Sequence, residues 1–504
     1  MKIFLFRFNS PMLIDVARNL VKEGHEILYW EASKKYFDAV RKSGEFKNTV
    51  FHSTYEAVRG VPSPDIEDTL FPSVGKDFLD ELLSCESQVL SMMMSVDYDS
   101  MPLLQKKKIF YEYVRYSNGL IDKLKPEAIV FGDIPHIAHQ YTLYKVAKLK
   151  GIKTIMFRTI PVLGRLIFLT DHTEYKELKN TMDTIKEPVV IDDLSEDMKK
   201  YYLLQTNLQK DATPFYMKDK YRNEFKKIPR LLPSFAIIFQ HIQKGTFLKT
   251  VRGYIKMNFF IKRKIASLDG IEISGFALKR KEARAQKIKE AFRKEYESLV
   301  EPIDYKKKYI YVALHKQPEA STSAMGGVFT DQILMVDILS QALPKNWILY
   351  VKESIIQWEN PRGELGRYSG YYKNMKKRDN IKFIDASTNT FKLIEHAKAI
   401  ATVTGTVGWE AILRGKPALI FGYIWYSHCD GAFRVVDVPS CKEVFNLIEK
   451  GRKPDKQKVL NFLKALDITT VKAFPNLRFK EDAGISIEEN IKVVTKSILE
   501  MLKS

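Results

Sequence analysis

The sequence has few cysteines and no long hydrophobic run. Only 3 of its 504 residues are cysteine, and Cys85, Cys429 and Cys441 lack the C-x-x-C spacing of a zinc or redox site. Widely spaced cysteines in an odd number favour a reducing compartment. The longest charge-free stretch in the basic middle, residues 231–243, is shorter than the roughly 20 apolar residues that a helix needs to cross a bilayer. We therefore predict no transmembrane span.

Several signature motifs are missing as well. Arg7 interrupts the apolar run at residues 3–8 and no small-residue cleavage site follows it, so we expect no export signal and a cytoplasmic location. The chain contains no Walker loop, no G-x-G-x-x-G and no nucleophile elbow. These absences argue against kinase, dehydrogenase and hydrolase functions.

Basic residues outnumber acidic ones, 81 against 61, so the net charge is +20 and anionic partners are favoured. Residues 225–268 hold ten Lys and Arg, seven Phe and Tyr, and no acidic residue. Two interpretations of this segment stay open: a solvated helical face over buried aromatics, or an amphipathic segment that lies on the inner face of an anionic membrane. Nucleic-acid binding is not expected, because no RNP, zinc-finger or helix-turn-helix signature accompanies the charge.

The hydrophobic pattern of the chain is typical of two parallel α/β regions. In the first region we expect strands at residues 3–8, 26–30, 126–131 and 153–157, and helices at 12–23 and 136–149. In the second we expect strands at residues 309–314, 347–351, 381–384, 399–403 and 418–421. Strands that alternate with helices in this way form parallel sheets. Residues 175–300, between the two regions, carry long charged helices without strand signals.

Residues 401–417 are the most informative stretch. They place an apolar strand before a hydroxyl- and glycine-rich turn, Thr404-Gly405-Thr406, that leads directly into a helix. The first N–H groups of a helix lack intrahelical partners and lie at the positive end of its dipole, so such a turn can hold a phosphate. Glu410, one helical turn later, is placed to accept hydrogen bonds from ribose or sugar hydroxyls. The alternative is an ordinary helix that begins after a glycine turn.

Several blocks around this turn resemble the capsule polysaccharide biosynthesis family, whose members are GT-B type glycosyltransferases. The blocks similar to that family's donor-site region and late loop are Thr404-Gly405-Thr406-Val407-Gly408-Trp409-Glu410-Ala411, Arg414-Gly415-Lys416-Pro417, Phe421-Gly422, Tyr426 and Gly431. The blocks similar to its loop after the first C-terminal strand are Leu314-His315-Lys316-Gln317-Pro318-Glu319-Ala320-Ser321-Thr322, Gly326-Gly327-Val328-Phe329 and Asp331-Gln332. Together they cover about residues 310–435, whereas the N-terminal half matches only the GT-B succession of strands and helices.

The resemblance implies two Rossmann-like domains that face a cleft. The nucleotide-sugar would bind to the C-terminal domain and the acceptor to the N-terminal one. Ligands at the carboxyl ends of the strands are also expected for any open parallel sheet. The expected organisation is an N-terminal acceptor domain at residues 1–174, a basic helical insert with the candidate membrane contact at 175–300, a nucleotide-sugar domain at 301–485 and a C-terminal helix at 486–504.

One position departs from the family pattern. Relatives often carry Lys-Glu-His-Pro after the second C-terminal strand, where the His-Pro pair meets the nucleotide phosphate, but this chain has Lys352-Glu353-Ser354-Ile355. We expect Lys352 to hold the phosphate without that pair. The departure also bears on the donor, because the resemblance alone does not extend CMP-Kdo, the donor of some members, to this chain. It bears on catalytic activity as well.

The chemistry of glycosyl transfer indicates which groups to look for. Backbone N–H groups and a cation can stabilise the leaving nucleotide phosphate without a metal or another cofactor. The candidates are Thr404, Gly405, Thr406 and Lys352, with Glu410 for the sugar hydroxyls. An inverting transfer also needs a base near the acceptor hydroxyl, and the candidate bases are Glu319, Asp331, His315, Asp133 and His136. A loop cap is the alternative for Glu319, and a helix cap the alternative for Asp331.

The sequence thus predicts a glycosyltransferase. Its expected partners are a nucleotide-sugar donor and a saccharide or lipid-linked acceptor, and its product is a surface polysaccharide or glycolipid. Within enzymes, a GT-B-fold sugar-nucleotide 2-epimerase or a polyol-phosphate polymerase would use a similar phosphate turn. In a different class, the missing His-Pro pair allows a non-catalytic carbohydrate-binding or assembly protein.

Overall fold

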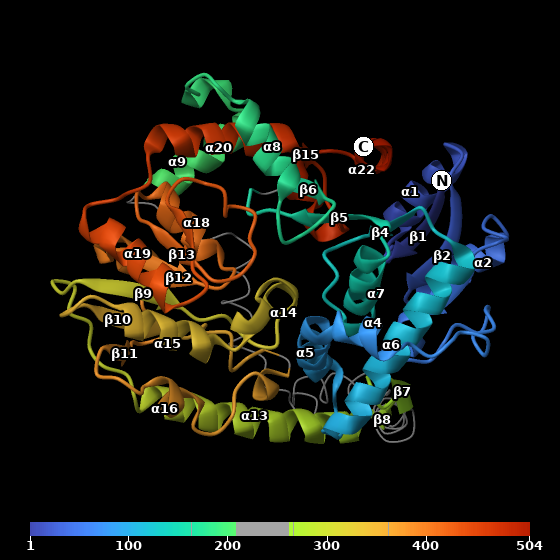
Figure 1. The fold of residues 1–504 in the computed structure, drawn as a ribbon, viewed down its shortest axis with the longest axis horizontal. Coiled ribbons are helices and arrows are strands. Elements are labelled where there is room, and N and C mark those ends of the chain that lie inside the picture. The colour runs from blue at the N-terminus through green and yellow to red at the C-terminus, as the bar shows by residue number, and fades with distance from the viewer. Residues whose placement is uncertain (163, 208–261, 266, 361) are drawn as a thin grey trace, which may run out of the picture.

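The computed structural model describes residues 1–162, 164–207, 262–265, 267–360 and 362–504 of the chain (Figure 1). Most of the basic segment at residues 225–268 lies outside these residues, so its membrane contact stays a prediction. Among the described helices, none combines the length and the apolar character needed to cross a bilayer.

The first sheet has seven strands in the order β15-β6-β5-β4-β1-β2-β3. They are β1 (Lys2–Phe6), β2 (Glu26–Ala32), β3 (Val50–Ser53), β4 (Ala128–Phe131), β5 (Lys153–Thr159), β6 (Arg165–Leu169) and β15 (Thr470–Lys472). The five strands from β5 to β3 are parallel, whereas β6 pairs antiparallel with both β5 and β15. All of β4 is buried, as expected for a parallel strand covered on both faces.

Helices cover both faces of this sheet. Ile3 and Leu5 of β1 belong to a core cluster with α1 and α22, and Phe4 and Phe6 to another with α5, α6 and α7, because side chains alternate between the faces of a strand. The helices of this part are α1 (Pro11–Lys22), α2 (Lys34–Ser43), α3 (Thr54–Ala57), α4 (Lys76–Asp80), α5 (Leu83–Met93), α6 (Leu103–Leu124), α7 (Ala138–Leu149) and α22 (Ile487–Lys503).

The second sheet has six parallel strands in the order β11-β10-β9-β12-β13-β14. They are β9 (Tyr309–Ala313), β10 (Ile348–Lys352), β11 (Ile381–Phe383), β12 (Ala399–Thr402), β13 (Ala418–Ile420) and β14 (Ala432–Arg434). The helices that follow these strands are α14 (Ala320–Met325), α15 (Gln332–Ala342), α16 (Tyr371–Met375), α17 (Thr390–His396), α18 (Thr406–Leu413), α19 (Val438–Glu449) and α20 (Lys456–Thr469).

Five further elements lie in the stretch of chain between the two sheets: α8 (Lys176–Thr184), α9 (Glu196–Thr206), β7 (Lys262–Lys264), β8 (Glu272–Ser274) and α13 (Gly275–Glu297). The short helix α21 (Lys480–Ala483) lies between β15 and α22. Figure 1 shows the two sheets side by side, with α8, α9 and α20 along one edge of the molecule and α13 along the opposite edge. The predicted α/β fold class with two Rossmann-like sheets, the GT-B arrangement, is confirmed.

The end of the chain returns to the first sheet. Residues 470–472, inside the range predicted for the C-terminal domain, form β15 and pair with β6. Helix α22 then packs against α1. The fully buried side chain of Asn490 fixes this return, because its amide accepts from the N–H of Phe474 at 2.7 Å and donates to the carbonyl of Phe474 at 3.1 Å. The sequence pattern alone does not indicate which half the last helix covers.

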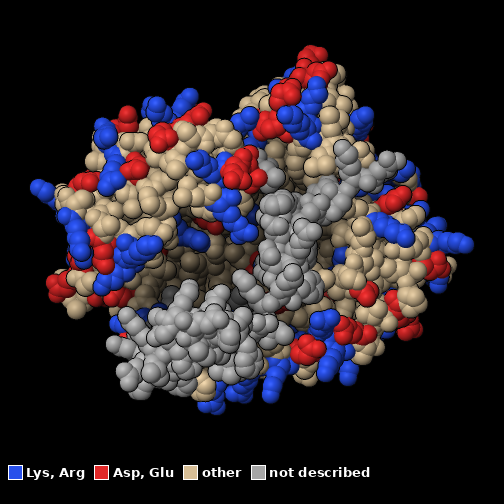
Figure 2. All heavy atoms as spheres, turned by 180° about the vertical axis from the view of Figure 1, so that it is seen from behind, with Lys and Arg blue, Asp and Glu red and all other residues tan. Residues whose placement is uncertain are grey.

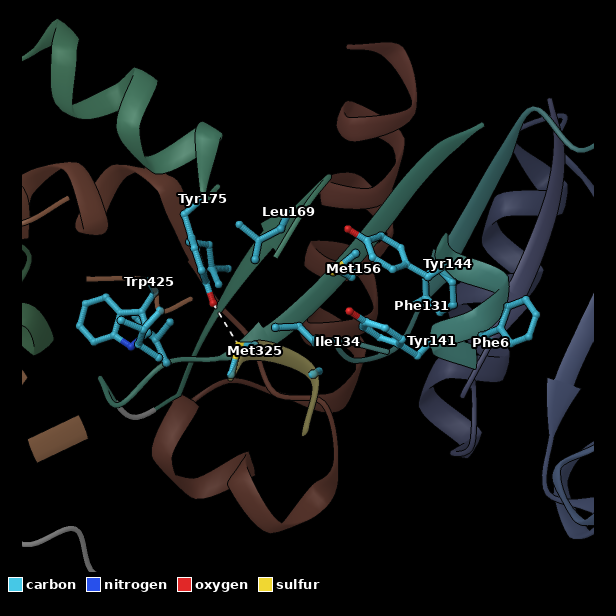
Figure 3. Close-up of a cluster of buried hydrophobic side chains, with 14 of the residues drawn as sticks. Phe6, Phe131, Ile134, Tyr141, Tyr144, Met156, Leu169, Tyr175, Met325 and Trp425 are labelled. Carbon is cyan, nitrogen blue, oxygen red and sulfur yellow. Dashed lines mark hydrogen bonds between the residues drawn. The ribbon is translucent and has the colours of Figure 1, made fainter. Parts of the chain in front are cut away.

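A continuous apolar cluster joins the two sheets. It runs from Phe131 and Tyr144 in the first domain to Met325 and Trp425 in the second (Figure 3). The hydroxyl of Tyr175 lies 3.6 Å from the sulfur of Met325, and the drawn side chains of the two domains point toward one another there. The short helix α14, which ends at Met325, is therefore one of the parts of the second domain that pack against the first.

Candidate functional site

Parallel pairing brings the loops of the resemblance to one edge of the second sheet. Strand β9 lies between β10 and β12, and all three run in the same direction. The loops at their carboxyl ends hold His315, Glu353 and the turn at Thr404, and Lys352 is the last residue of β10. Side chains that are far apart in the sequence thus meet at the edge where open parallel sheets bind ligands.

The turn before α18 is held by side chains from β12 and from the loop after β9. The N–H of Thr404 donates to Nε2 of His315 at 3.2 Å, and the N–H of Gly405 donates to the hydroxyl oxygen of Thr402 at 3.2 Å. We expected the Thr404 and Gly405 amides to face a phosphate. In the structure they instead fix the shape of the turn.

The amides one step further on are open. Gly405 is the N-cap of α18, and a glycine has no side chain that could cap the helix. Within the described part of the chain, no other side chain caps the N–H groups of Thr406 and Val407. Thr406 is exposed. The hydroxyl of Thr404 is buried beside this helix end and has no hydrogen-bond partner within the described residues. The open donors that could meet a phosphate are therefore those of Thr406 and Val407.

Lys352 and Glu410 lie close to this helix end. The ammonium of Lys352 donates to the carbonyl of Thr388 and to the hydroxyl of Thr390, both at 2.8 Å. Burial lowers the pKa of Lys352 to about 8, although the carboxylate of Glu410 raises it. The carboxylate of Glu410 accepts the hydroxyl of Thr406 at 3.2 Å. The structure thus brings together a cation, an open helix start and a carboxylate, all three predicted from the sequence.

His315 and Glu319 face each other in the loop after β9. Nδ1 of His315 lies 3.8 Å from a carboxylate oxygen of Glu319, which also accepts the hydroxyl of Thr322 at 3.0 Å. Burial lowers the pKa of His315, and the nearby Glu319 opposes the shift. Because Nε2 of His315 already accepts the Thr404 N–H, this ring has no free lone pair for a substrate proton.

Asp331 serves as a helix cap. It precedes α15, and its carboxylate accepts the N–H of Ile333 at 3.1 Å. This contact is the alternative that the sequence left open for this residue, and it places the carboxylate at the positive end of the helix dipole.

Asp133 and His136 follow β4 in the first domain. Nδ1 of His136 lies 2.8 Å from the carbonyl of Ile134, and Nε2 lies 2.6 Å from the guanidinium of Arg7. Nδ1 therefore carries the proton and Nε2 accepts from Arg7, which matches a pKa of His136 lowered by burial and by Arg7. One oxygen of Asp133 accepts the N–H of Ile134, and the other lies 4.0 Å from Arg7, in a side chain that is 42% exposed.

Three arginine residues that were not among the candidate site residues lie near the two halves of the site. Arg7 follows β1, and Arg158 lies near the carboxyl end of β5 and donates to the sulfur of Met325 at 2.8 Å, across the domain junction. Arg367 donates to the carbonyl of His315 at 2.9 Å. The place of Arg7 and Arg158 at strand ends was a usable signal, whereas nothing in the sequence pattern pointed to Arg367.

Helix α9 supports the back of α18. The indole N–H of Trp409 donates to the hydroxyl of Tyr201 at 3.1 Å. Trp409 also packs edge-on against Trp425, with ring centroids 4.9 Å apart. The buried face of α18 is thus fixed by aromatic side chains from α9 and from the loop after β13, while its start stays open.

Residues 97–99 read Asp-Tyr-Asp, the D-x-D spacing that metal-using glycosyltransferases of another fold employ, but both carboxylates are engaged in ion pairs. Asp97 pairs with Lys106 at 2.7 Å, and Asp99 pairs with Lys281 of α13. Within the described ranges, no group of three or more His, Cys, Asp or Glu side chains could hold a metal ion. Metal independence stays a prediction.

Charge on the described surface is mixed. Figure 2 shows Lys and Arg side chains interspersed with Asp and Glu over the face opposite to that of Figure 1. Much of the excess charge of residues 225–268 is not among the described residues. The predicted membrane contact therefore depends on the composition of that segment.

Comparison with known proteins agrees with the motif analysis. Residues 363–431 match the family described as capsule polysaccharide biosynthesis protein. The chain is 27% identical over 79 residues to the capsule polysaccharide modification protein LipA of Neisseria meningitidis serogroup B, and the match covers 14% of this chain and 11% of that relative. The curated relative is thus matched over about a tenth of its length.

Two solved structures are similar at low identity. The β-Kdo 2,7 transferase of Thermosulfurimonas dismutans KpsC is 12% identical, with coverage of 79% of this chain and 97% of that one and a TM-score of 0.30. The UDP-GlcNAc 2-epimerase of Methanocaldococcus jannaschii is 13% identical, with coverage of 93% and 99% and a TM-score of 0.24. The sequence match includes the turn at Thr404 and the whole of α18, and it agrees with the resemblance found from the motifs: residues 363–431 are similar to the capsule polysaccharide biosynthesis family.

Proposed function

We propose that the protein is a glycosyltransferase that moves a sugar from a nucleotide-activated donor to a growing surface polysaccharide or glycolipid. The observation that carries this proposal is the open start of α18, where the uncapped N–H groups of Thr406 and Val407 lie in the family segment near Lys352. An amide pair at a helix start and a buried ammonium are the groups that stabilise a phosphate.

In the proposed reaction, the bond between the sugar and the donor phosphate breaks and the acceptor oxygen takes its place. The released phosphate gains negative charge, which the α18 amides and Lys352 would stabilise without rearrangement. Glu410 would accept hydrogen bonds from hydroxyls of the donor. The acceptor hydroxyl loses its proton to a base on the facing domain.

We assign the base role to Asp133. His315 and His136 have their unprotonated nitrogens occupied by Thr404 and Arg7, and Asp331 caps α15. One carboxylate oxygen of Glu319 accepts the hydroxyl of Thr322 and faces Nδ1 of His315. One carboxylate oxygen of Asp133 lies 4.0 Å from the guanidinium of Arg7 and 3.9 Å from Nδ1 of His136, too far for a hydrogen bond. The side chain is partly exposed and lies at the carboxyl edge of the first sheet. A partly solvated carboxylate at that edge can approach a bound acceptor.

Isothermal titration with a panel of nucleoside monophosphates, nucleoside diphosphates and nucleotide-sugars tests the donor site. We expect one nucleotide class to bind, and Glu410→Ala to weaken binding of the nucleotide-sugar. Glu443→Ala, an exposed position on α19, is the matched control and should bind as the wild type does. If no nucleotide binds, or if the Glu410 and Glu443 variants behave alike, the donor-site assignment is wrong.

The residues Ser354 and Ile355, in place of the family's His-Pro pair, support a second candidate, a non-catalytic protein that binds activated sugars. Mass spectrometry of reaction mixtures separates the outcomes. A glycosylated acceptor supports transfer, a changed sugar on the same nucleotide supports a 2-epimerase, an extended polyol-phosphate chain supports a polymerase, and binding without any turnover supports the non-catalytic role.

We also propose that the protein acts at the cytoplasmic face of an anionic membrane. The composition of residues 225–268 and the net charge of +20 support this. Flotation with anionic and neutral liposomes at low salt tests it, and replacing Lys226, Lys227 and Arg230 by Gln should reduce recovery with the anionic vesicles. Equal recovery with both vesicle types would contradict the proposal, because the attraction is electrostatic and screened by salt.

A further inference from the structure

The imidazole of His315 links the loop after β9 to the turn before α18. Its Nε2 lies 2.9 Å from the hydroxyl of Thr402 and 3.2 Å from the N–H of Thr404. Thr402 in turn accepts the N–H of Gly405. One ring nitrogen thus organises both ends of the turn that precedes the open helix start.

These contacts assign the proton of the ring. A backbone N–H can only donate, so Nε2 must present its lone pair to Thr404. The neutral ring then carries its proton on Nδ1, which faces the carboxylate of Glu319 at 3.8 Å. A carboxylate beside an N–H stabilises this tautomer, as it does for other histidines that act through their second nitrogen.

The backbone of His315 is held as firmly as its ring. The side-chain amide of Gln332 accepts the N–H of His315 at 2.6 Å and donates to its carbonyl at 2.9 Å. The guanidinium of Arg367 donates to the same carbonyl at 2.9 Å, and Arg367 is itself paired with the fully buried Glu353. Such a set of contacts fixes the ring in one position relative to Thr404.

We propose that His315 is a positioning residue and not a base. As a neutral ring protonated on Nδ1, it holds residues 402–405 in the shape that leaves the Thr406 and Val407 amides open to the donor phosphate. The inference rests on the proposed function for its last step. It replaces the base role that the sequence suggested for this residue.

The proposal makes donor binding sensitive to acid. A proton on Nε2 would meet the N–H of Thr404 and remove the hydrogen bond. Of the charged groups that face the ring, Glu319 favours its protonation, whereas Arg367, which is neutralised in part by Glu353, opposes it. Burial of the ring also disfavours its protonated form and lowers the pKa of His315. The turn therefore keeps its shape at neutral pH and loses it only when the pH falls below the range in which histidines usually titrate.

Three substitutions separate positioning from base catalysis. The terminal amide of Gln reaches about as far as Nε2, and that of Asn about as far as Nδ1. His315→Gln should therefore keep nucleotide affinity within a few-fold and retain turnover, whereas His315→Asn and His315→Ala should weaken binding by about ten-fold, because they leave the buried N–H of Thr404 unpaired. If His315 is a base, all three lose turnover equally and bind nucleotide normally, since neither amide can take a proton.

Proton-detected NMR with ¹⁵N-histidine gives a readout that does not depend on turnover. The chain has 9 histidines, and the signal lost in His315→Gln identifies His315. We expect a protonated Nδ1 and a bare Nε2, and a protonated Nε2 at neutral pH would overturn the positioning role. Wild-type protein that shows the expected tautomer but binds no nucleotide would instead overturn the proposed function, so the two failures are distinguishable.

Discussion

The carboxylate of Glu353 accepts two hydrogen bonds from the guanidinium of Arg367, at 2.8 and 3.0 Å. Both side chains are almost completely buried, with 0% and 1% exposure. The hydroxyl of Tyr372 donates to the same carboxylate at 2.7 Å. Because Arg367 also donates to the carbonyl of His315, this pair ties the loop after β10 to the loop after β9.

Arg367→Met is expected to lower the free energy of unfolding by about 3–5 kcal/mol, because it leaves the charge of Glu353 buried without its partner. Urea denaturation measures the loss. The double variant Glu353→Met/Arg367→Met should recover part of it, since no lone charge remains. The control is Arg378→Met, which breaks the exposed pair with Asp337 and should cost about 1 kcal/mol or less. Equal losses for the Arg367 and Arg378 variants would contradict the assignment.

Lys352 should make donor binding sensitive to alkali. Its pKa is lowered to about 8 by burial, so the ammonium is charged at pH 7 and loses its proton as the pH rises through that value. Nucleoside diphosphate affinity of the wild type should therefore fall above about pH 8, and Lys352→Met should bind weakly at every pH. Lys352→Arg should show no such fall, because a guanidinium stays charged. The same alkaline loss in Lys352→Arg would exclude Lys352 as the titrating group.

The fold was predictable where the residues of a single helix or strand are enough to indicate its structure. Helix α1 was expected at residues 12–23 and spans Pro11–Lys22, since Ser10 caps it and buried apolar residues repeat at helical spacing. Strands β9, β10 and β12 are short apolar runs buried on both faces. The strands β14 and β15 were not predicted, because their pairing partners, and not their composition, make them strands.

The same division holds for the site. Thr404, Lys352 and His315 were found from the sequence because each follows a predicted strand, and parallel strands bring their carboxyl ends together. The sequence could not tell that the Thr404 amide is used by His315, because this contact joins loops 89 residues apart in the chain. The pairing of Arg367 with Glu353 was hidden for a related reason: the partner of a guanidinium is decided by packing in three dimensions.

Asp133→Asn should reduce turnover by about 10²–10⁴-fold while leaving nucleotide affinity within two-fold, because general bases contribute factors of that size to the chemical step. Turnover is followed as nucleotide released from the donor in the presence of acceptor. Asp331→Asn is the matched control: it removes a carboxylate at a strand-to-helix loop, but Asn caps a helix about as well as Asp, so stability and turnover should stay unchanged. A loss of turnover confined to Asp331→Asn would move the base role to the second domain.

Gly405→Ala should close the donor site through one added methyl group. A Cβ at this position would lie 2.6 Å from the hydroxyl oxygen of Thr402 and 3.2 Å from Cε1 of His315. The φ of Gly405 is −80°, a value open to alanine, so any effect comes from these contacts and not from backbone strain.

Nucleotide affinity of Gly405→Ala should fall by about ten-fold or more as the turn is pushed away from His315. Gly75→Ala, where the added Cβ meets open space, is the control and should bind as the wild type does. The double variant Thr402→Ala/Gly405→Ala removes the Thr402 hydroxyl, which is both the atom nearest to the added Cβ and the acceptor of the residue 405 N–H. Relative to Gly405→Ala, it should therefore recover more of the stability, measured by thermal unfolding, than of the nucleotide affinity. The added methyl group must displace the turn from Thr402 and His315. Wild-type nucleotide affinity in Gly405→Ala would therefore show that the shape of the turn does not govern binding.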